Sequence, residues 1–171
     1  MVQRYHFCPW CGGSLHYQKQ QEQNRLTCVQ CEKIFYENPV VGVAGILLNE
    51  QGRVLLGRRS PTSTYSGLWC IPCGYVEYDE EVRAALQREF LEETGLVVKP
   101  GQVFTALSNF HNPAQHTVGI WFWVEKCSGL EQAGDDLSEV AYFSLETLPP
   151  LAFPTDQQVL AMLLNQSKQN K

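Results

Sequence analysis

Four cysteines near the N-terminus limit how the first part of this chain can fold. They form two Cys-x-x-Cys pairs separated by 16 residues, at Cys8, Cys11, Cys28 and Cys31. Thiolates with this spacing are typical of a closed tetrahedral Zn²⁺ site held by two turns that strands connect. A segment of this length is too short to bury a hydrophobic core unaided. We therefore expect a small zinc ribbon over residues 1–37, in which structural Zn²⁺ replaces much of the core.

Disulfide bonds are the alternative use of these cysteines. The N-terminal sequence MVQRYHFC lacks the basic and apolar segments of a secretory signal, and cytosolic glutathione keeps thiols reduced. No stretch approaches the roughly 20 apolar residues needed to span a bilayer. These features favour a zinc site in a soluble, cytoplasmic protein that does not contact a membrane.

A boundary between two parts of the chain is expected at Asn38 and Pro39, because the Asn-Pro pair favours a turn. Residues 38–171 are numerous enough to form one domain with a sizeable core. The net charge of −5 argues against a protein that follows a nucleic-acid backbone, whose binding surface would be basic. We therefore expect a small anionic substrate and no nucleic-acid partner.

The second part of the chain alternates apolar runs with turn residues. Such runs predict strands, which we expect within residues 40–48, 52–59, 96–110, 116–127 and 138–150. A short turn separates the first two runs, so we expect them to pair as a hairpin.

Two segments show helical periodicity. Apolar residues recur every four positions in residues 80–94, and Gly95 follows as a C-terminal cap. Residues 155–166 open with Thr155, a candidate N-cap, before apolar positions that fall on one helix face. Strands flanking two helices indicate an α/β fold with a mixed sheet between helices.

Three glutamates lie on about one turn of the first predicted helix. Glu89 is three residues from Glu92 and four from Glu93, so we expect the three carboxylates to face one another. A divalent cation with a preference for oxygen ligands would convert their repulsion into coordination. The alternative is a solvated acidic surface, which explains most glutamate runs.

The sequence around these glutamates, GYVEYDEEVRAALQREFLEETGL at residues 74–96, resembles a complete Nudix box. The preceding GLWCIPCG also resembles the strand and turn that lead into the box, although Cys73 stands where relatives commonly have glycine. The resemblance implies an α/β/α sandwich with a mixed sheet, preceded here by the zinc ribbon. It also implies a hydrolase that cleaves a nucleoside diphosphate joined to another group.

Cleavage of a diphosphate requires its negative charge to be neutralised and a water to be activated, and Mg²⁺ or Mn²⁺ does both. Glu89, Glu92 and Glu93 are the expected ligands, and the resemblance adds the backbone carbonyl of Gly74. The resemblance also implies that Glu80 and Arg88 form an ion pair that positions the ligand carboxylates. The expected catalytic residues are Glu80, Arg88, Glu93 and Glu139.

The general base is less well defined by the sequence. Relatives often use a carboxylate outside the box, and Glu139 is the favoured candidate here, with Glu93 an equal contender. Asp135 and Asp136 are further candidates, but Gly-Asp-Asp is also an ordinary turn composition, which is the preferred interpretation for Asp135.

The substrate is narrowed by resemblance to two Nudix groups with an N-terminal cysteine module. NADH pyrophosphatases carry a Ser-Gln-Pro-Trp-Pro-Phe-Pro signature where this chain has ALSNFHNPAQHTVG. FCPWCGG, and CVQC followed by IFYENP, instead resemble a group that cleaves FAD or ADP-ribose. We therefore expect FAD or ADP-ribose as substrate and AMP as a product. An NADH pyrophosphatase and a non-catalytic ligand sensor or adaptor stay as alternatives, and the resemblance leaves a homodimer open.

The sequence does not identify the residues that bind the substrate. Aromatic side chains that could stack on a base are Tyr65, Trp69, Tyr75, Phe110, Trp121 and Trp123. Trp121 and Trp123 share one face of a predicted strand, with Phe122 on the other. His111 and His116 are isolated histidines that we expect on loops or at the surface.

Overall fold

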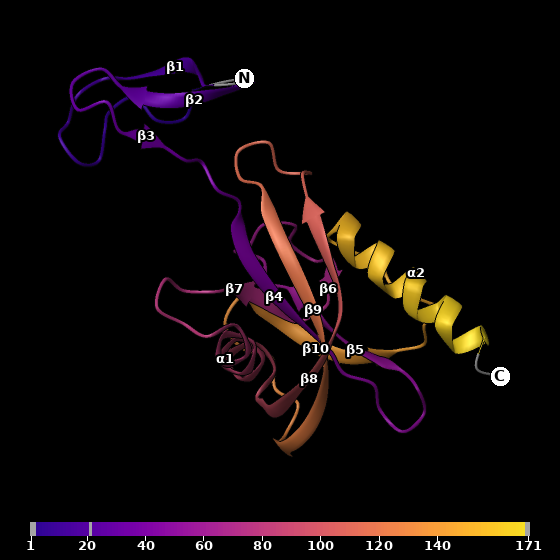
Figure 1. The fold of residues 1–171 in the computed structure, drawn as a ribbon. Coiled ribbons are helices and arrows are strands. Elements are labelled where there is room, and N and C mark those ends of the chain that lie inside the picture. The colour runs from indigo at the N-terminus through magenta and orange to yellow at the C-terminus, as the bar shows by residue number, and fades with distance from the viewer. Residues whose placement is uncertain (1–2, 21, 170–171) are drawn as a thin grey trace. The chain divides into compact units, whose positions relative to one another are not determined.

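The computed structural model describes residues 3–20 and 22–169 (Figure 1). It divides into two compact units, Met1–Asn38 and Pro39–Lys171. The division falls at the Asn-Pro pair. No helix among the described residues is long and apolar enough to cross a membrane.

The N-terminal unit is a three-stranded antiparallel sheet in the order β1-β2-β3. Its strands are β1 (Leu15–Gln20), β2 (Gln23–Cys28) and β3 (Ile34–Phe35). Its buried core consists of Leu15 and Leu26 together with Cys8 and Cys28. So few buried side chains contribute little hydrophobic stabilisation, which agrees with a fold that depends on its cysteines.

The C-terminal unit contains two sheets. The first has the order β7-β4-β9-β8 and is mixed, because β4 and β9 run parallel while the other neighbours are antiparallel. Its strands are β4 (Val40–Ile46), β7 (Cys73–Tyr75), β8 (Leu96–Asn109) and β9 (Thr117–Gly129). The second is antiparallel and consists of β10 (Leu137–Phe143), β5 (Val54–Arg59) and β6 (Trp69–Cys70).

The predicted hairpin between residues 40–48 and 52–59 forms only next to the turn, where Leu48 pairs antiparallel with Val54, and does not extend along the two strands. β4 and β5 belong to different sheets, and they meet only near the turn, where Leu55 N–H donates to the Leu47 carbonyl at 2.9 Å. Both edges of β4 are already occupied, by β7 on one side and β9 on the other. Apolar periodicity identifies strands but does not identify their partners.

The first helix, α1 (Val82–Thr94), begins two residues later than predicted. The Glu81 carboxylate caps it by accepting hydrogen bonds from the backbone N–H groups of Arg83 and Ala84. Gly95 ends it with φ of 70°, and its N–H donates to the Leu91 carbonyl. This left-handed cap is the one that the sequence predicts.

The second helix, α2 (Pro154–Gln169), begins one residue earlier and ends three residues later than predicted. Thr155 therefore lies inside the first turn and is not the N-cap. Proline suits the first helical position, because its fixed φ is already helical and that position needs no N–H donor.

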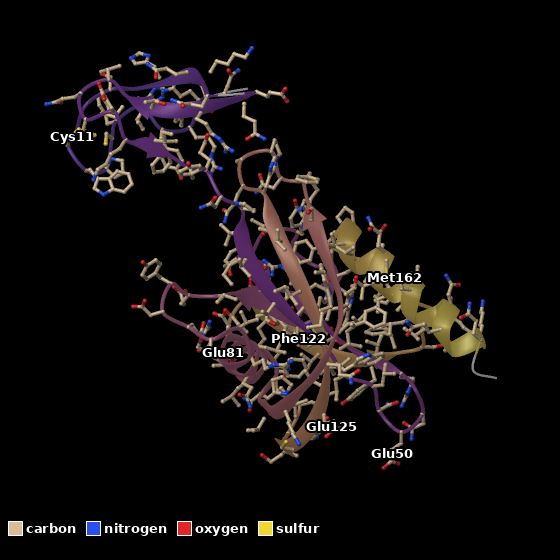
Figure 2. All side chains as sticks on the ribbon, viewed as in Figure 1. Cys11, Glu50, Glu81, Phe122, Glu125 and Met162 are labelled. Carbon is tan, nitrogen blue, oxygen red and sulfur yellow. The ribbon has the colours of Figure 1, made fainter. Side chains whose placement is uncertain are left out.

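The two helices cover opposite faces of the mixed sheet, which confirms the predicted α/β/α sandwich (Figure 1). Phe90 of α1 packs with Val43 and Phe122 on one face. Leu160 of α2 packs with Trp121 on the other. Phe122 is buried in the core, whereas Met162 on α2 is exposed; both are labelled in Figure 2. The alternation of side chains along β4 and β9 thus fixes which residues meet each helix.

Candidate active site

A cavity of about 400 Å³ joins the end of α1 to the start of α2. Strands β4, β7 and β9 line it, together with the loop that precedes β10. The residues that line it include Arg59, Tyr65, Gly74, Tyr75, Glu89, Glu93, His111, Trp121, Asp135, Asp136, Phe153 and Asp156. One part of the cavity is acidic and another is aromatic.

Arg88 is the centre of a network of carboxylates beside this cavity. Its guanidinium makes two hydrogen bonds of 2.8 Å to Glu80, one with each carboxylate oxygen. It also pairs with Glu89 at 2.9 Å and Glu92 at 3.1 Å, and it donates to the Tyr75 carbonyl. The structure thus contains the expected ion pair, and Arg88 joins the loop after β7 to α1.

The Arg88 guanidinium lowers the pKa of Glu80 to about 2. A carboxyl with a depressed pKa stabilises the fold fully above its unfolded value of about 4.5 and loses that contribution as the pH falls toward 2. Glu80→Gln should therefore lower the urea midpoint at pH 7, and the difference from wild type should shrink to nothing near pH 2. Urea unfolding at several pH values measures this, and a difference that does not change with pH would contradict it.

Glu89 lies directly against the backbone of Gly74. A Cβ atom added at Gly74 would overlap the Glu89 carboxylate, so the carboxylate occupies space that any other residue would fill. Burial raises the pKa of Glu89, and the charge of Arg88 opposes this effect. The close approach places the Glu89 carboxylate directly against the Gly74 backbone, a position that only glycine leaves free.

Gly74→Ala should displace the Glu89 carboxylate and lower kcat/KM by about 10²-fold, the size of effect expected from a misplacement near 1 Å. The clash is with the flexible end of a side chain, so the melting temperature should change little. Steady-state kinetics and a thermal melt on the same preparation measure both effects. Wild-type kinetics in the variant would show that the contact has no role in the reaction.

Glu93 is the most deeply buried acid of α1, with 1% of its surface exposed. It accepts a hydrogen bond of 2.7 Å from the Cys73 backbone N–H. Burial raises its pKa well above the usual range, and the charges of Asp136 and Glu89 add to this. A buried carboxylate among other acids is costly unless a cation or donors compensate it.

The three glutamates do not all face one another as predicted. Glu89 and Glu93 line the cavity, whereas Glu92 has 49% of its side chain exposed and binds Arg88. Among the described residues, no trio of carboxylates brings its oxygen atoms within 4.8 Å. Residues 92 and 93 project about 100° apart on a helix, so sequence spacing alone placed Glu92 too close to the others.

Two aspartates before β10 complete the acidic part. Asp135 raises the pKa of Glu89, and Asp136 raises that of Glu93, because each lies near that acid. Asp136 binds Arg59 at 2.8 Å through one oxygen, while its other oxygen is buried with no hydrogen-bond partner among the described residues. The turn that the sequence favours for Asp135 is present, with φ of 49°, and it directs both residues to the cavity.

Glu139, the favoured general base in the sequence, does not line the cavity. It faces Arg58 across β10 and β5 and forms an exposed ion pair of 3.5 Å. The position of Glu139 on strand β10 directs its side chain to Arg58 and not to the cavity. Asp135 and Asp136 lie on the loop before that strand.

The aromatic part of the cavity contains Tyr65 and Trp121, which the sequence identifies, and Phe153 and Asp156, which it does not. His111 was expected on a loop, and it packs there against Tyr65 and Phe153, with ring centroids 5.7 and 5.8 Å away. The other aromatic candidates differ in whether they line the cavity. Tyr75 also lines the cavity, whereas those outside it are Trp69, Phe110 and Trp123.

The four N-terminal cysteines lie together, with all their sulfur atoms within 4.8 Å of one another. Two of the sulfur pairs, Cys8 with Cys31 and Cys11 with Cys28, are 3.7 and 3.5 Å apart. Tetrahedral Zn–S bonds of about 2.3 Å place sulfur atoms about 3.8 Å apart, so the cluster fits one Zn²⁺. Backbone N–H groups of Cys31 and Gln30 lower the pKa of Cys28 to about 6, whereas the neighbouring Cys31 and Cys28 thiols raise that of Cys11 to about 12. The closely spaced thiols thus compete for ionisation, which a bound cation would relieve.

Comparison with known proteins matches both units. The family described as NUDIX domain matches residues 38–163, and the family described as Nudix N-terminal, a zinc ribbon, matches residues 6–37. A NUDIX hydrolase structure from Nitrosomonas europaea superimposes with a TM-score of 0.78 and 28% identity, and covers 91% of this chain and 88% of that one.

Two curated relatives carry names of different activities. An ADP-ribose pyrophosphatase of Methanocaldococcus jannaschii is 35% identical over 119 residues, which are 69% of each chain. The NAD-capped RNA hydrolase NudC of Vibrio cholerae is 30% identical over 155 residues, which are 89% of this chain and 54% of the relative. The chain therefore spans about half the length of that relative. The family match covers most of the chain and includes the helix that builds the acidic part of the cavity, so this chain belongs to the Nudix hydrolases.

Proposed function

We propose that this chain is a metal-dependent pyrophosphatase that hydrolyses FAD or ADP-ribose and releases AMP. The observation that carries the proposal is the single cavity in which Glu89 and Glu93 lie near an aromatic wall. Carboxylates that hold a metal ion suit the cleavage of a diphosphate, and an aromatic wall suits the binding of a nucleoside base. The similarity to an ADP-ribose pyrophosphatase supports this substrate class.

Glu89, Glu93 and the Gly74 carbonyl would hold Mg²⁺ or Mn²⁺, with Glu92 contributing from the exposed side. The fit is chemical: Glu93 is buried and Glu89 partly buried, and further acids, Asp135 and Asp136, line the same cavity. Burial, and to a smaller extent these neighbouring charges, raise the pKa of both glutamates, and a bound cation would offset that cost. A bound divalent ion supplies charge neutralisation and a more acidic water. Glu80 and Arg88 hold the carboxylates in place and do not contact the substrate.

Asp136 is the better-placed general base. Arg59 fixes one of its oxygens, and the other is buried beside the cavity without a protein donor. A carboxylate held in this way can accept a proton from an attacking water within hydrogen-bond reach. Arg59, which is mostly buried, would also attract a phosphate group.

The N-terminal unit is proposed as a zinc ribbon over residues 1–37, followed by the Nudix domain over 38–171. Cys8, Cys11, Cys28 and Cys31 hold a structural Zn²⁺ in this proposal. All four ligand positions are then occupied by protein, which leaves no open position for catalysis.

Hydrolysis of NADH, or of an NAD group on RNA, is the second candidate function. It is favoured by the similarity to NudC, which extends over 89% of this chain. The exposed aromatic residues and scattered basic residues of the N-terminal unit do not by themselves select a nucleic acid.

A panel assay distinguishes these candidates. The chain is incubated with FAD, ADP-ribose, NADH or NAD-capped RNA, with Mg²⁺ or Mn²⁺, and AMP release or decapping is measured. We expect the highest kcat/KM for FAD or ADP-ribose. A preference for NADH or capped RNA would replace the first candidate with the second, and no product from any substrate would reject both.

A further inference from the structure

Asp156 is a buried carboxylate that the proposed chemistry does not use. It lies in the first turn of α2 and has 2% of its surface exposed. Its Oδ2 atom accepts a hydrogen bond of 2.9 Å from the Ile71 backbone N–H. Burial raises its pKa to about 7, against the effects of the Ile71 N–H and the nearby Trp121 indole. The Trp121 indole N–H lies near the same carboxylate, although no hydrogen bond of ordinary geometry joins the two groups.

Trp121 presents the complementary group. Its side chain is 5% exposed, and its indole Nε1 is buried without a hydrogen bond of ordinary geometry to any described residue. The indole cannot easily turn away, because its six-membered ring occupies the space beside Gly119 where a Cβ would lie. A fixed, unpaired N–H donor in a cavity wall is unfavourable unless a ligand accepts its hydrogen bond.

The surroundings of this pair suit a planar ring. Tyr65, His111 and Phe153 line the same cavity, and their ring centroids lie 5.6 to 5.8 Å from one another. Aromatic walls bind heterocycles by stacking and apolar contact. An acceptor and a donor beside such a wall can read the edge of a base.

We propose that Asp156 and Trp121 recognise an aminopurine, with the Asp156 carboxylate accepting from the exocyclic amine and the Trp121 indole N–H donating to the adjacent ring nitrogen. The inference rests on the proposed function, because it places the adenine of the AMP product in the aromatic part of the cavity. It also assigns two specificity residues that take no part in the bond cleavage.

NMR of the full-length protein at pH 8, where Asp156 is ionised, tests this directly. The Trp121 indole N–H signal is assigned by its loss in Trp121→Phe and followed during titration with AMP, N6,N6-dimethyl-AMP or ribose 5-phosphate. We expect AMP to shift this signal and ribose 5-phosphate to leave it unmoved. Dimethyl-AMP has no amine hydrogens and should bind about tenfold or more weakly than AMP.

Asp156→Asn is the matched variant. Its amide oxygen can still accept from the Ile71 N–H, while its NH₂ group replaces the acceptor that faces the amine. It should bind AMP about tenfold more weakly and lose the preference over dimethyl-AMP. If this variant does not fold, the titrations of the wild-type protein with AMP and dimethyl-AMP test the proposal on their own.

An indole signal that saturating AMP leaves unmoved, or equal binding of AMP and dimethyl-AMP, would overturn the inference. Binding of AMP does not depend on hydrolysis, so the two proposals can fail separately. AMP recognition without turnover would reject the proposed function, and turnover without a shift at Trp121 would reject the base assignment.

Discussion

Glu93→Gln should lower kcat by about 10²- to 10³-fold, the effect expected when one preorganised charge of a catalytic site is removed. The variant should be as stable as wild type or more stable. The amide oxygen can keep the hydrogen bond from the Cys73 N–H, and burial penalises a neutral amide less than a carboxylate. Activity should thus fall without a loss of stability, whereas general damage to the fold would lower both.

Glu125→Gln is the control for this experiment. Glu125 lies on β9 and is exposed, and it is not among the residues that line the cavity (Figure 2). The same chemical change there should leave kcat and the melting temperature near wild type. Steady-state kinetics and thermal unfolding of both variants are compared at saturating Mg²⁺. Near-normal turnover in Glu93→Gln would end the assignment of Glu93 to the metal site.

The local structure of the Nudix box could be predicted because its determinants lie close together in sequence. Apolar residues every four positions define α1, and Gly95 adopts the left-handed conformation that ends it. The alternation along β9 also predicts that Trp121 and Trp123 face away from Phe122, as the two core clusters show. These features depend on backbone geometry within a few residues.

The pairing of strands and the full content of the cavity depend on long-range contacts, so the sequence did not reveal them. The sequence predicts β5 as the hairpin partner of β4, but in the structure the neighbours of β5 in its sheet are β10 and β6. Asp156 lies far from the box in sequence and reaches the cavity because α2 packs against Ile71 and Trp121. A lone aspartate near the start of a helix gives no signal of this contact.

The direction of a side chain also separates candidates of the same chemistry. Asp136 and Glu139 are three residues apart, yet one lines the cavity and the other pairs with Arg58 outside it. The strand β10 begins between them, at Leu137. Only the structure shows where the loop ends and the strand begins, and this boundary determines which way each side chain points. The sequence alone therefore could not decide which of these acids lies in the cavity.

Removing zinc should unfold the N-terminal unit while leaving the Nudix domain folded. The buried core of this unit is formed around Leu15, Leu26, Cys8 and Cys28, and half of these side chains are proposed metal ligands. Binding of structural Zn²⁺ is worth on the order of 10 kcal/mol in small zinc modules, which is folding free energy. A strong chelator, or Cys28→Ser, should therefore collapse the amide NMR signals of residues 3–37.

Cys127→Ser provides the matched control, because Cys127 is exposed on β9 and lies outside the four-cysteine group. Zinc content by elemental analysis should be about one ion per chain in wild type and in this control. The Cys28→Ser variant should contain little zinc, and signals of the Nudix domain should stay dispersed because its own core is much larger. Zinc-free protein with dispersed signals for residues 3–37 would show that the cysteines pack without metal. The fold of the ribbon would then require another source of stability.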